Sequence, residues 1–332
     1  MKKILAIVCI IFTCSSFGQK NSDVDEDYIE LFPHHISLTQ SIFRKDIGIS
    51  IKEKKYPRLG YTINSRMKLG YHIAWKFISF GFAVNIPIGG NEEKYGQTNT
   101  FDFRTNFFIK NKILGDFYLV QSNGMHLSNP TQHIPEFKRT DNYPQFSNMK
   151  ATQIGLDVLY MFNGSEYSYK AAFGQNAHQL KSAGSLLVGG YLYFIGVDND
   201  GLLYPLADTS SFVQLTDLKG FNITTFGAAA GYAQNFVVKE HGLIGMMGLI
   251  GTGLSSFTEK TLTGETNDHN NFSTRIKLKG VLGYQGDVHN AGAQLQVNAL
   301  LTTFAEGVRG SSILGYTGIY YKVQFPTKKY RN

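Results

Sequence analysis

Two stretches near the C-terminus, AGAQLQVNALL at residues 291–301 and TGIYYKVQF at residues 317–325, decide the fold class of this chain. In both, small or apolar residues stand at every second position, and polar residues such as Gln294 and Lys322 stand between them. Side chains on a β-strand point to opposite faces with a period of two. The pattern therefore predicts two strands that each have one apolar face and one largely polar face.

The same alternation recurs every ten to fifteen residues from about residue 34 onward, most clearly at residues 69–75, 78–86, 101–110, 153–160, 167–173 and 275–279. Charged side chains lie on the polar face of several of these segments. An Arg or Lys that faces lipid costs about 2–4 kcal/mol at the bilayer midplane. We therefore expect these residues to line a lumen: Asp102, Arg104, Asp157, Lys170, Arg275, Lys277, Lys279 and Lys322. The residues expected to face outward include Phe80, Phe82, Phe103, Leu156, Leu295, Val297 and Val323.

These strands predict an all-β fold, a single antiparallel transmembrane β-barrel that spans residues 34–325. We expect about fourteen strands, or twelve if the weaker segments merge. About ten residues suffice for a strand to cross a bilayer, and lipid tolerates no open strand edge, so the sheet has to close. Residues 19–33 are acidic without alternation and are expected to form a periplasmic lead-in, and residues 326–332 a C-terminal tail. A soluble antiparallel sandwich also alternates and stays an alternative.

The N-terminus has the plan of a secretory signal peptide. Lys2 and Lys3 precede a short apolar run, and Ser16 and Gly18 place small residues before a cut that leaves Gln19 first. The run is too short to cross a bilayer as a helix. We therefore expect residues 1–18 to be removed on export.

Both cysteines, Cys9 and Cys14, lie inside that signal peptide. Cleavage before a lipidated Cys14 is the alternative, but the residues before it match the lipoprotein pattern poorly. With the signal peptide removed, the chain has no cysteine. This excludes disulfides, a thiolate nucleophile and cysteine-based metal sites.

The composition agrees with a membrane-embedded barrel. Charged residues make up 17% of the chain, below the roughly 25% of a soluble domain, while aromatic residues reach 14%. Aromatic girdles at the membrane interfaces account for such a shift. The formal net charge of +7 is scattered, so we expect no nucleic-acid partner and instead expect contact with outer-membrane lipid.

Several stretches resemble an uncharacterised family of Gram-negative outer-membrane barrels, a domain of unknown function. They are YTIN at 61–64, LGY at 69–71, TFDFR at 100–104, YMFN at 160–163, YSYKAAF at 167–173, QLKSAGS at 179–185 and GYA at 231–233. The aromatic-ended last strand also resembles the C-terminal strand of such barrels, which implies the barrel-insertion machinery as a partner. The resemblance implies a membrane-embedded barrel and supplies no catalytic residue.

One segment suggests chemistry. His126 and Ser128 stand two apart on an extended stretch and point to the same side, so the imidazole could take the serine's proton. The segment resembles the site of outer-membrane lipid A deacylases and phospholipases, although the surroundings depart from that site. No acidic residue is clearly placed to orient His126. A lipid hydrolase that uses Ser128 and His126 is therefore the alternative function.

We expect a non-enzymatic barrel that is a narrow or plugged pore, a transporter or a structural surface protein. The histidines are scattered without metal-ligand spacing, and the glycine-rich segments follow no nucleotide-binding pattern, so no metal and no cofactor is expected. Lumen charges of mixed sign favour plugging over conduction. A small solute or an anion remains a candidate partner.

Overall fold

The computed structural model describes residues 24–32, 34–53, 56–174, 177–203, 217–264, 268–305 and 307–326. The expected signal peptide and nearly all of the expected tail lie outside these residues. No helix among them is long and apolar enough to cross a membrane.

The described chain is built almost entirely of strands. In chain order they are β1 (Ile29–Leu31), β2 (His35–Glu53), β3 (Leu59–Thr62), β4 (Met67–Trp75), β5 (Ile78–Asn85), β6 (Asn99–Ile109), β7 (Ile113–Leu127), β8 (Gln145–Met161), β9 (Ala177–Gln179), β10 (Ala183–Asp198), β11 (Leu218–Val238), β12 (Gly242–Thr261), β13 (Asp268–Gln285), β14 (His289–Ala305) and β15 (Val308–Pro326). The helical pieces are α2 (Glu92–Tyr95), η2 (Pro130–Gln132) and the π-helical turn η3 (Lys170–Gly174).

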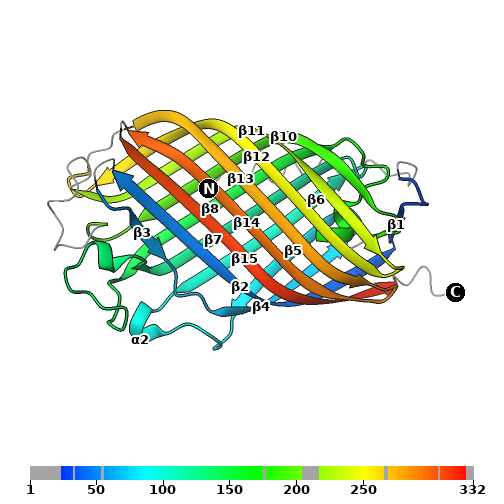
Figure 1. Cartoon of the computed structure of the whole chain (residues 1–332), viewed down its shortest axis with the longest axis horizontal. Helices are drawn as coiled ribbons and strands as arrows, with labels where there is room; N and C mark the ends of the chain where they lie inside the picture. The colour runs from blue at the N-terminus through cyan, green and yellow to red at the C-terminus, as the bar shows by residue number, and fades with distance from the viewer. Residues whose placement is uncertain are drawn as a thin grey trace.

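Thirteen of the described strands form one antiparallel sheet that closes on itself (Figure 1). Each long strand pairs with its neighbour in the chain, and β15 pairs with β2 from Val308↔Glu53 to Pro326↔His35. Closure leaves no open edge, as lipid requires. The prediction of an all-β antiparallel barrel is confirmed: twelve strands form the full ring, and β3 is the thirteenth member of the sheet.

The ring forks at one place. The first half of β2, Ile36–Arg44, pairs with β4, whereas Gly48–Ile51 pairs with β3. On the far side of the fork, β7 pairs with β6 and then, at His126 and Leu127, with β3. Strands β4, β5 and β6 therefore complete the ring only at the end where both termini of the barrel lie, which we call the terminal end. At the opposite loop end, β3 replaces them.

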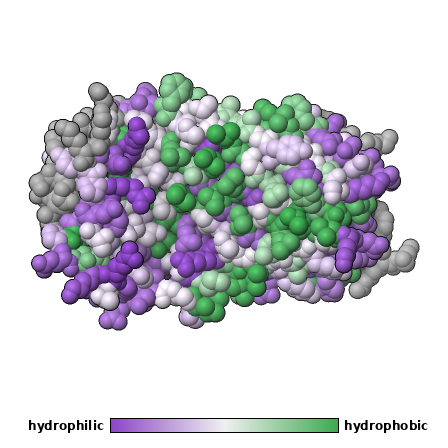
Figure 2. Space-filling model, viewed as in Figure 1, coloured by the Kyte–Doolittle hydropathy of each residue, from purple (hydrophilic) through white to green (hydrophobic). Residues whose placement is uncertain are grey.

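The outer surface of the terminal half is apolar. Phe80, Phe82 and Leu295 are 41%, 56% and 49% exposed, whereas Asp157 and Lys277 on the other face are 0% and 1% exposed. The outward and inward faces are thus as predicted. Figure 2 shows apolar residues gathered over the middle and the terminal end, with hydrophilic residues at the loop end.

The polarity of the two faces of β2 reverses along the strand, while odd-numbered residues face inward throughout. In its first half Leu38 and Ile42 are exposed and Thr39 is buried, but in its second half Ile47, Ile49 and Ile51 are buried. Matching interior residues from other strands form one apolar core within the loop half of the barrel, as in a water-soluble protein. Near Arg44 the apolar side chains of β2 pass from its outward face to its inward face, and the apolar outer surface ends there.

One sequence prediction, the strand at residues 167–173, is wrong. Residues 167–173 form no strand. They lie in a long connection, residues 162–182, that contains η3 and β9. Tyr167 and Tyr169 alternate because both bury their rings inside the barrel, at 0% exposure each. The expected lead-in also contains β1, which pairs antiparallel with β9. Finally, β15 continues to Pro326, one residue into the expected tail.

Candidate functional site

Five buried charges meet inside the barrel and form what we call the lumen cluster: Asp116 of β7, Asp157 of β8, and Arg275, Lys277 and Lys279 of β13. The Arg275 guanidinium binds both carboxylate oxygens of Asp157, with Nη2 2.8 Å from Oδ2. Lys277 Nζ lies 2.6 Å from Asp116 and 2.7 Å from Asp157. Lys279 Nζ lies 2.9 Å from Asp116.

These contacts cross the interior. Strands β12, β11 and β10 separate β13 from β8 in the ring, so side chains that touch have to reach over the lumen. Aromatic rings complete the layer, because the Arg275 guanidinium lies 4.5 Å from the ring centroid of Tyr193 and 5.0 Å from that of Tyr191. Planar guanidinium groups stack well on such rings. The lumen cluster therefore spans the interior with paired, not free, charges.

A second group of charges lies on the opposite wall. Lys45 of β2 forms an ion pair with Asp102 of β6, and Arg104 Nε lies 3.5 Å from the same carboxylate. The Arg104 guanidinium also lies 5.2 Å from the Tyr316 ring centroid and donates to Gln296 across 3.4 Å. Both predicted charges on β6 thus face inward and are paired.

At the terminal end of the barrel lies what we call the plug, which consists of residues 24–32, 162–174 and 177–182. Gln179, 1% exposed, is its centre. Its amide nitrogen donates to the carbonyls of Tyr28 and Glu166, and its amide oxygen accepts from Asn235 of β11. Its backbone NH donates to Gln285 of β13. The plug is therefore hydrogen-bonded to the barrel wall on two strands.

The plug also contacts the lumen cluster, because the Tyr169 hydroxyl accepts a hydrogen bond from Lys279 Nζ. Lys170 lies in the plug on η3, with Nζ 5.0 Å from the Phe108 ring centroid. Burial lowers the pKa of Lys170 to about 8. Lys170 thus lies inside the barrel, although not on the strand that the sequence predicted. Lys322, on β15, is buried as well, at 1% exposure.

His178 of β9 and Glu30 of β1 are titratable groups that face each other between the two strands of the plug. Its Nδ1 lies 3.4 Å from the Glu30 carboxylate, which favours the protonated ring. Burial, and then the charge of Lys322, act in the opposite direction and lower the pKa of His178 to about 4. We take burial to dominate, because His178 is 5% exposed while the Glu30 side chain is 49% exposed and screened by water.

His126 and Ser128, the predicted hydrolase pair, lie in different environments, because His126 is buried and Ser128 is exposed. His126 is buried between the rings of Tyr95 and Tyr143, with centroids at 4.8 and 5.6 Å, and its Nδ1 has no hydrogen-bond partner among the described residues. Ser128 is exposed, and its backbone NH donates to Gly60. Within the same described residues, no hydrogen bond joins the two side chains and no carboxylate bonds the imidazole. His126 is therefore enclosed by two tyrosines and lacks an orienting group.

Sequence reasoning missed Asp116, which pairs with Lys277 and Lys279, and Lys45, which pairs with Asp102. Asp116 is the one charged residue in the otherwise apolar stretch 113–120. Its inward neighbours Leu114, Tyr118 and Val120 have the same parity, and that shared parity was the available signal. No three His, Cys, Asp or Glu side chains in the described part of the chain gather into a set that could hold a metal ion.

A family model for the Domain of unknown function (DUF4421) matches residues 23–320, which include every strand of the ring except the last six residues of β15. The chain belongs to the DUF4421 family. A comparison with curated proteins found no match. Membership of the DUF4421 family agrees with the resemblance noted from the sequence, and it assigns no activity.

Solved structures similar to this DUF4421 chain include outer-membrane proteins. The outer membrane protease OmpT from Escherichia coli has 8% identity and a TM-score of 0.40, over 92% of this chain and 100% of that one. The Pseudomonas putida toluene transporter TodX has 9% identity and a TM-score of 0.30, over 89% and 91%. The outer membrane protein OprG from Pseudomonas aeruginosa has 9% identity and a TM-score of 0.23, over 91% and 100%. None of these likenesses carries an activity over to this chain.

Proposed function

We propose that this protein is an integral barrel of the Gram-negative outer membrane whose lumen is closed at rest, and that it has no enzymatic activity. The apolar outer surface of the terminal half supports the membrane placement. Side chains such as Ile250, Leu282 and Ile319 are 62%, 62% and 61% exposed there. Surfaces of this size and polarity are characteristic of contact with lipid or with another protein.

The single observation that carries the closed state is the lumen cluster. Side chains of β13 form ion pairs with β7 and β8 across the interior. These side chains occupy the space that water would fill in an open pore. The plug closes the terminal end below the cluster, and the apolar core fills the loop half above it. An open channel would require the lumen cluster, the plug and the apolar core all to rearrange.

The last strand supports the barrel-insertion machinery as a partner. Tyr321 and Phe325 are 49% and 50% exposed on the outward face of β15, at its terminal end. Before β15 pairs with β2, its backbone edge is free to pair with another strand. We propose that the insertion machinery binds this strand while the barrel is still open.

A lipid hydrolase at His126 and Ser128 is the competing function. The geometry described above supplies neither a bond between the two side chains nor an orienter for the imidazole. We therefore expect Ser128→Ala to leave lipid turnover unchanged. Release of fatty acid from lipid by the wild-type protein, abolished in Ser128→Ala, would replace our proposal with the hydrolase.

The closed lumen is tested by electrical recording. Purified full-length protein, inserted in planar lipid bilayers, should show no steady conductance at low voltage, while a porin inserted in parallel provides the positive control. Heat-modifiable gel migration of the same sample verifies that the barrel is folded. Stable ohmic steps from folded wild-type protein would contradict the closed state and favour a pore.

A further inference from the structure

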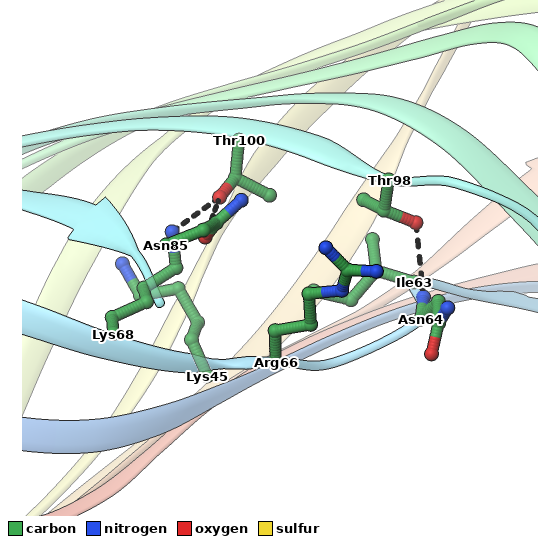
Figure 3. A pocket seen from close by; sticks show the side chains of 8 residues that line it. All are labelled: Lys45, Ile63, Asn64, Arg66, Lys68, Asn85, Thr98 and Thr100. Atoms are coloured by element: carbon green, nitrogen blue, oxygen red, sulfur yellow. Dashed lines mark hydrogen bonds between the residues drawn. The ribbon is translucent and has the colours of Figure 1, made fainter. Parts of the chain in front are cut away.

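The fork in the ring creates a crevice between β3 and the short strands β4 to β6. Figure 3 shows its walls, with Lys45, Lys68 and Arg66 rising from one side toward Thr98, Thr100 and Asn85 on the other. Asn64 fixes the loop-end wall, because its backbone NH donates to Thr98 and its side chain donates to the Gly96 carbonyl. The crevice has room for about one water-sized group, which is the size of a single phosphate oxygen.

The crevice lies level with the edge of the apolar outer surface. Lys68 is paired in register with Phe43, one residue before Arg44, where β2 changes from apolar to polar on its outward side. Within the neighbouring short strands, the exposed Val84 and Phe101 are the last large apolar residues toward the loop end, and Ile88 is exposed in the connection beyond β5. In a membrane-embedded barrel this is the level of the lipid headgroups on the loop side.

The charges at the crevice are unbalanced. Lys45 is neutralised by Asp102, and Arg66 is paired with the half-exposed Glu92. Lys68, 2% exposed, donates to the Thr100 hydroxyl, and no ion pair joins it to a carboxylate in the described part of the chain. A buried ammonium with only a neutral partner retains donors for an anion. Arg66 at the mouth adds a second, forked donor that suits phosphate oxygens.

We propose that the fork crevice binds a phosphate group, with one phosphate oxygen on Lys68 and the remainder at Arg66. The source is the headgroup of a phosphorylated lipid whose acyl chains lie along the exposed faces of β4 to β6. This choice of source rests on the proposed membrane placement, whereas the phosphate chemistry does not. The site would bind lipid at the fork, where β2 and β7 change their pairing partners.

The test is native mass spectrometry of full-length protein in detergent, with phosphatidic acid, phosphatidylcholine or inorganic phosphate added. We expect wild type to retain phosphatidic acid at least tenfold better than phosphatidylcholine, whose phosphate carries a covalently attached cation. Lys68→Gln should lose that preference, and Lys68→Arg should keep it. Lys52→Gln, which alters an exposed lysine of β2, is the matched control.

Each outcome is decisive. Equal retention of the two lipids, or an unchanged preference in a Lys68→Gln protein that still shows heat-modifiable migration, would overturn the site. Loss of phosphatidic acid to equimolar inorganic phosphate would assign the crevice to free phosphate and overturn the lipid source. Should Lys68→Gln fail to fold, Thr100→Val combined with Arg66→Gln tests the crevice from both sides, and an unchanged preference for phosphatidic acid in that variant would overturn the site. Conductance of the wild type is measured separately, so failure of the closed-lumen proposal stays distinguishable.

Discussion

Replacement of Asp157 by Asn should be one of the most damaging isosteric changes in the barrel. The carboxylate of Asp157 is the bidentate partner of Arg275 and the second partner of Lys277. The amide keeps the size of the side chain but removes its charge. Arg275, 2% exposed, would then be buried beside Tyr191 and Tyr193 without a counter-charge.

Removal of one partner of a buried pair costs about 3–5 kcal/mol, because the remaining charge stays desolvated. We expect Asp157→Asn to lower the free energy of unfolding by an amount in that range. Lys260→Ala removes a surface ion pair with Asp198, at 3.0 Å, and should cost about 1 kcal/mol or less. The double variant Asp157→Asn/Arg275→Gln should cost less than the sum of its single changes, because the two residues share one ion pair.

The assay is guanidinium unfolding of protein folded into lipid vesicles. Trp75, the only tryptophan, is 46% exposed on the outward face and reports the loss of lipid contact by fluorescence. If Asp157→Asn costs no more than Lys260→Ala, the lumen cluster does not stabilise the closed barrel and the reasoning fails.

Three further outcomes are expected. Leu278→Arg places a charge on the outward face of β13 between two inward lysines and should cost about 2–4 kcal/mol in the same vesicle assay; no loss would show that this face does not meet lipid. N-terminal mass spectrometry of exported protein should find Gln19 first, and a diacylated Cys14 would contradict this processing. The pKa of His178 is lowered to about 4 from its ordinary 6.5, so the stability that this residue contributes to docking of the plug is fully present above pH 6.5 and is lost as pH falls toward 4, by up to about 3 kcal/mol. Hydrogen–deuterium exchange at Ala177–Gln179, corrected for the pH dependence of intrinsic exchange, should show protection that falls over that window, and a His178→Asn protein with the same fall would rule out this residue as its cause.

The ring was predictable because lipid imposes a strict rule on outward side chains. Lys277 and Leu278 cannot exchange faces without placing a charge in the bilayer, so the alternation around them gives the register directly. The mixed signs of the predicted lumen charges likewise indicated pairing within a narrow interior. Neither inference required knowledge of which strands lie opposite each other.

The structure of the segments inside the barrel was harder to predict, because a buried turn and a buried strand can show the same alternation of apolar and polar residues. Tyr167 and Tyr169 alternate with polar residues, yet their rings enter the barrel from a π-helical turn. The partners of the lumen cluster come from strands distant in the chain, and one sequence does not indicate which of them meet. One signal was readable: the exposed Leu38 and Ile42 occupy even positions, whereas the buried Ile47 and Ile49 occupy odd ones.

Because of the fork, the barrel has a different circumference in its terminal half and in its loop half. Among the described strands, twelve surround the terminal half, but only β3 and nine of those twelve surround the loop half. Because barrel diameter grows roughly linearly with strand number, the loop half is about one sixth narrower. The nine shared strands continue into a folded apolar core, whereas β4, β5 and β6 end at the level that we assign to the headgroups in the proposed membrane placement. A bilayer of altered thickness would therefore strain those three short strands first, since they have no extension beyond the membrane over which to distribute the mismatch.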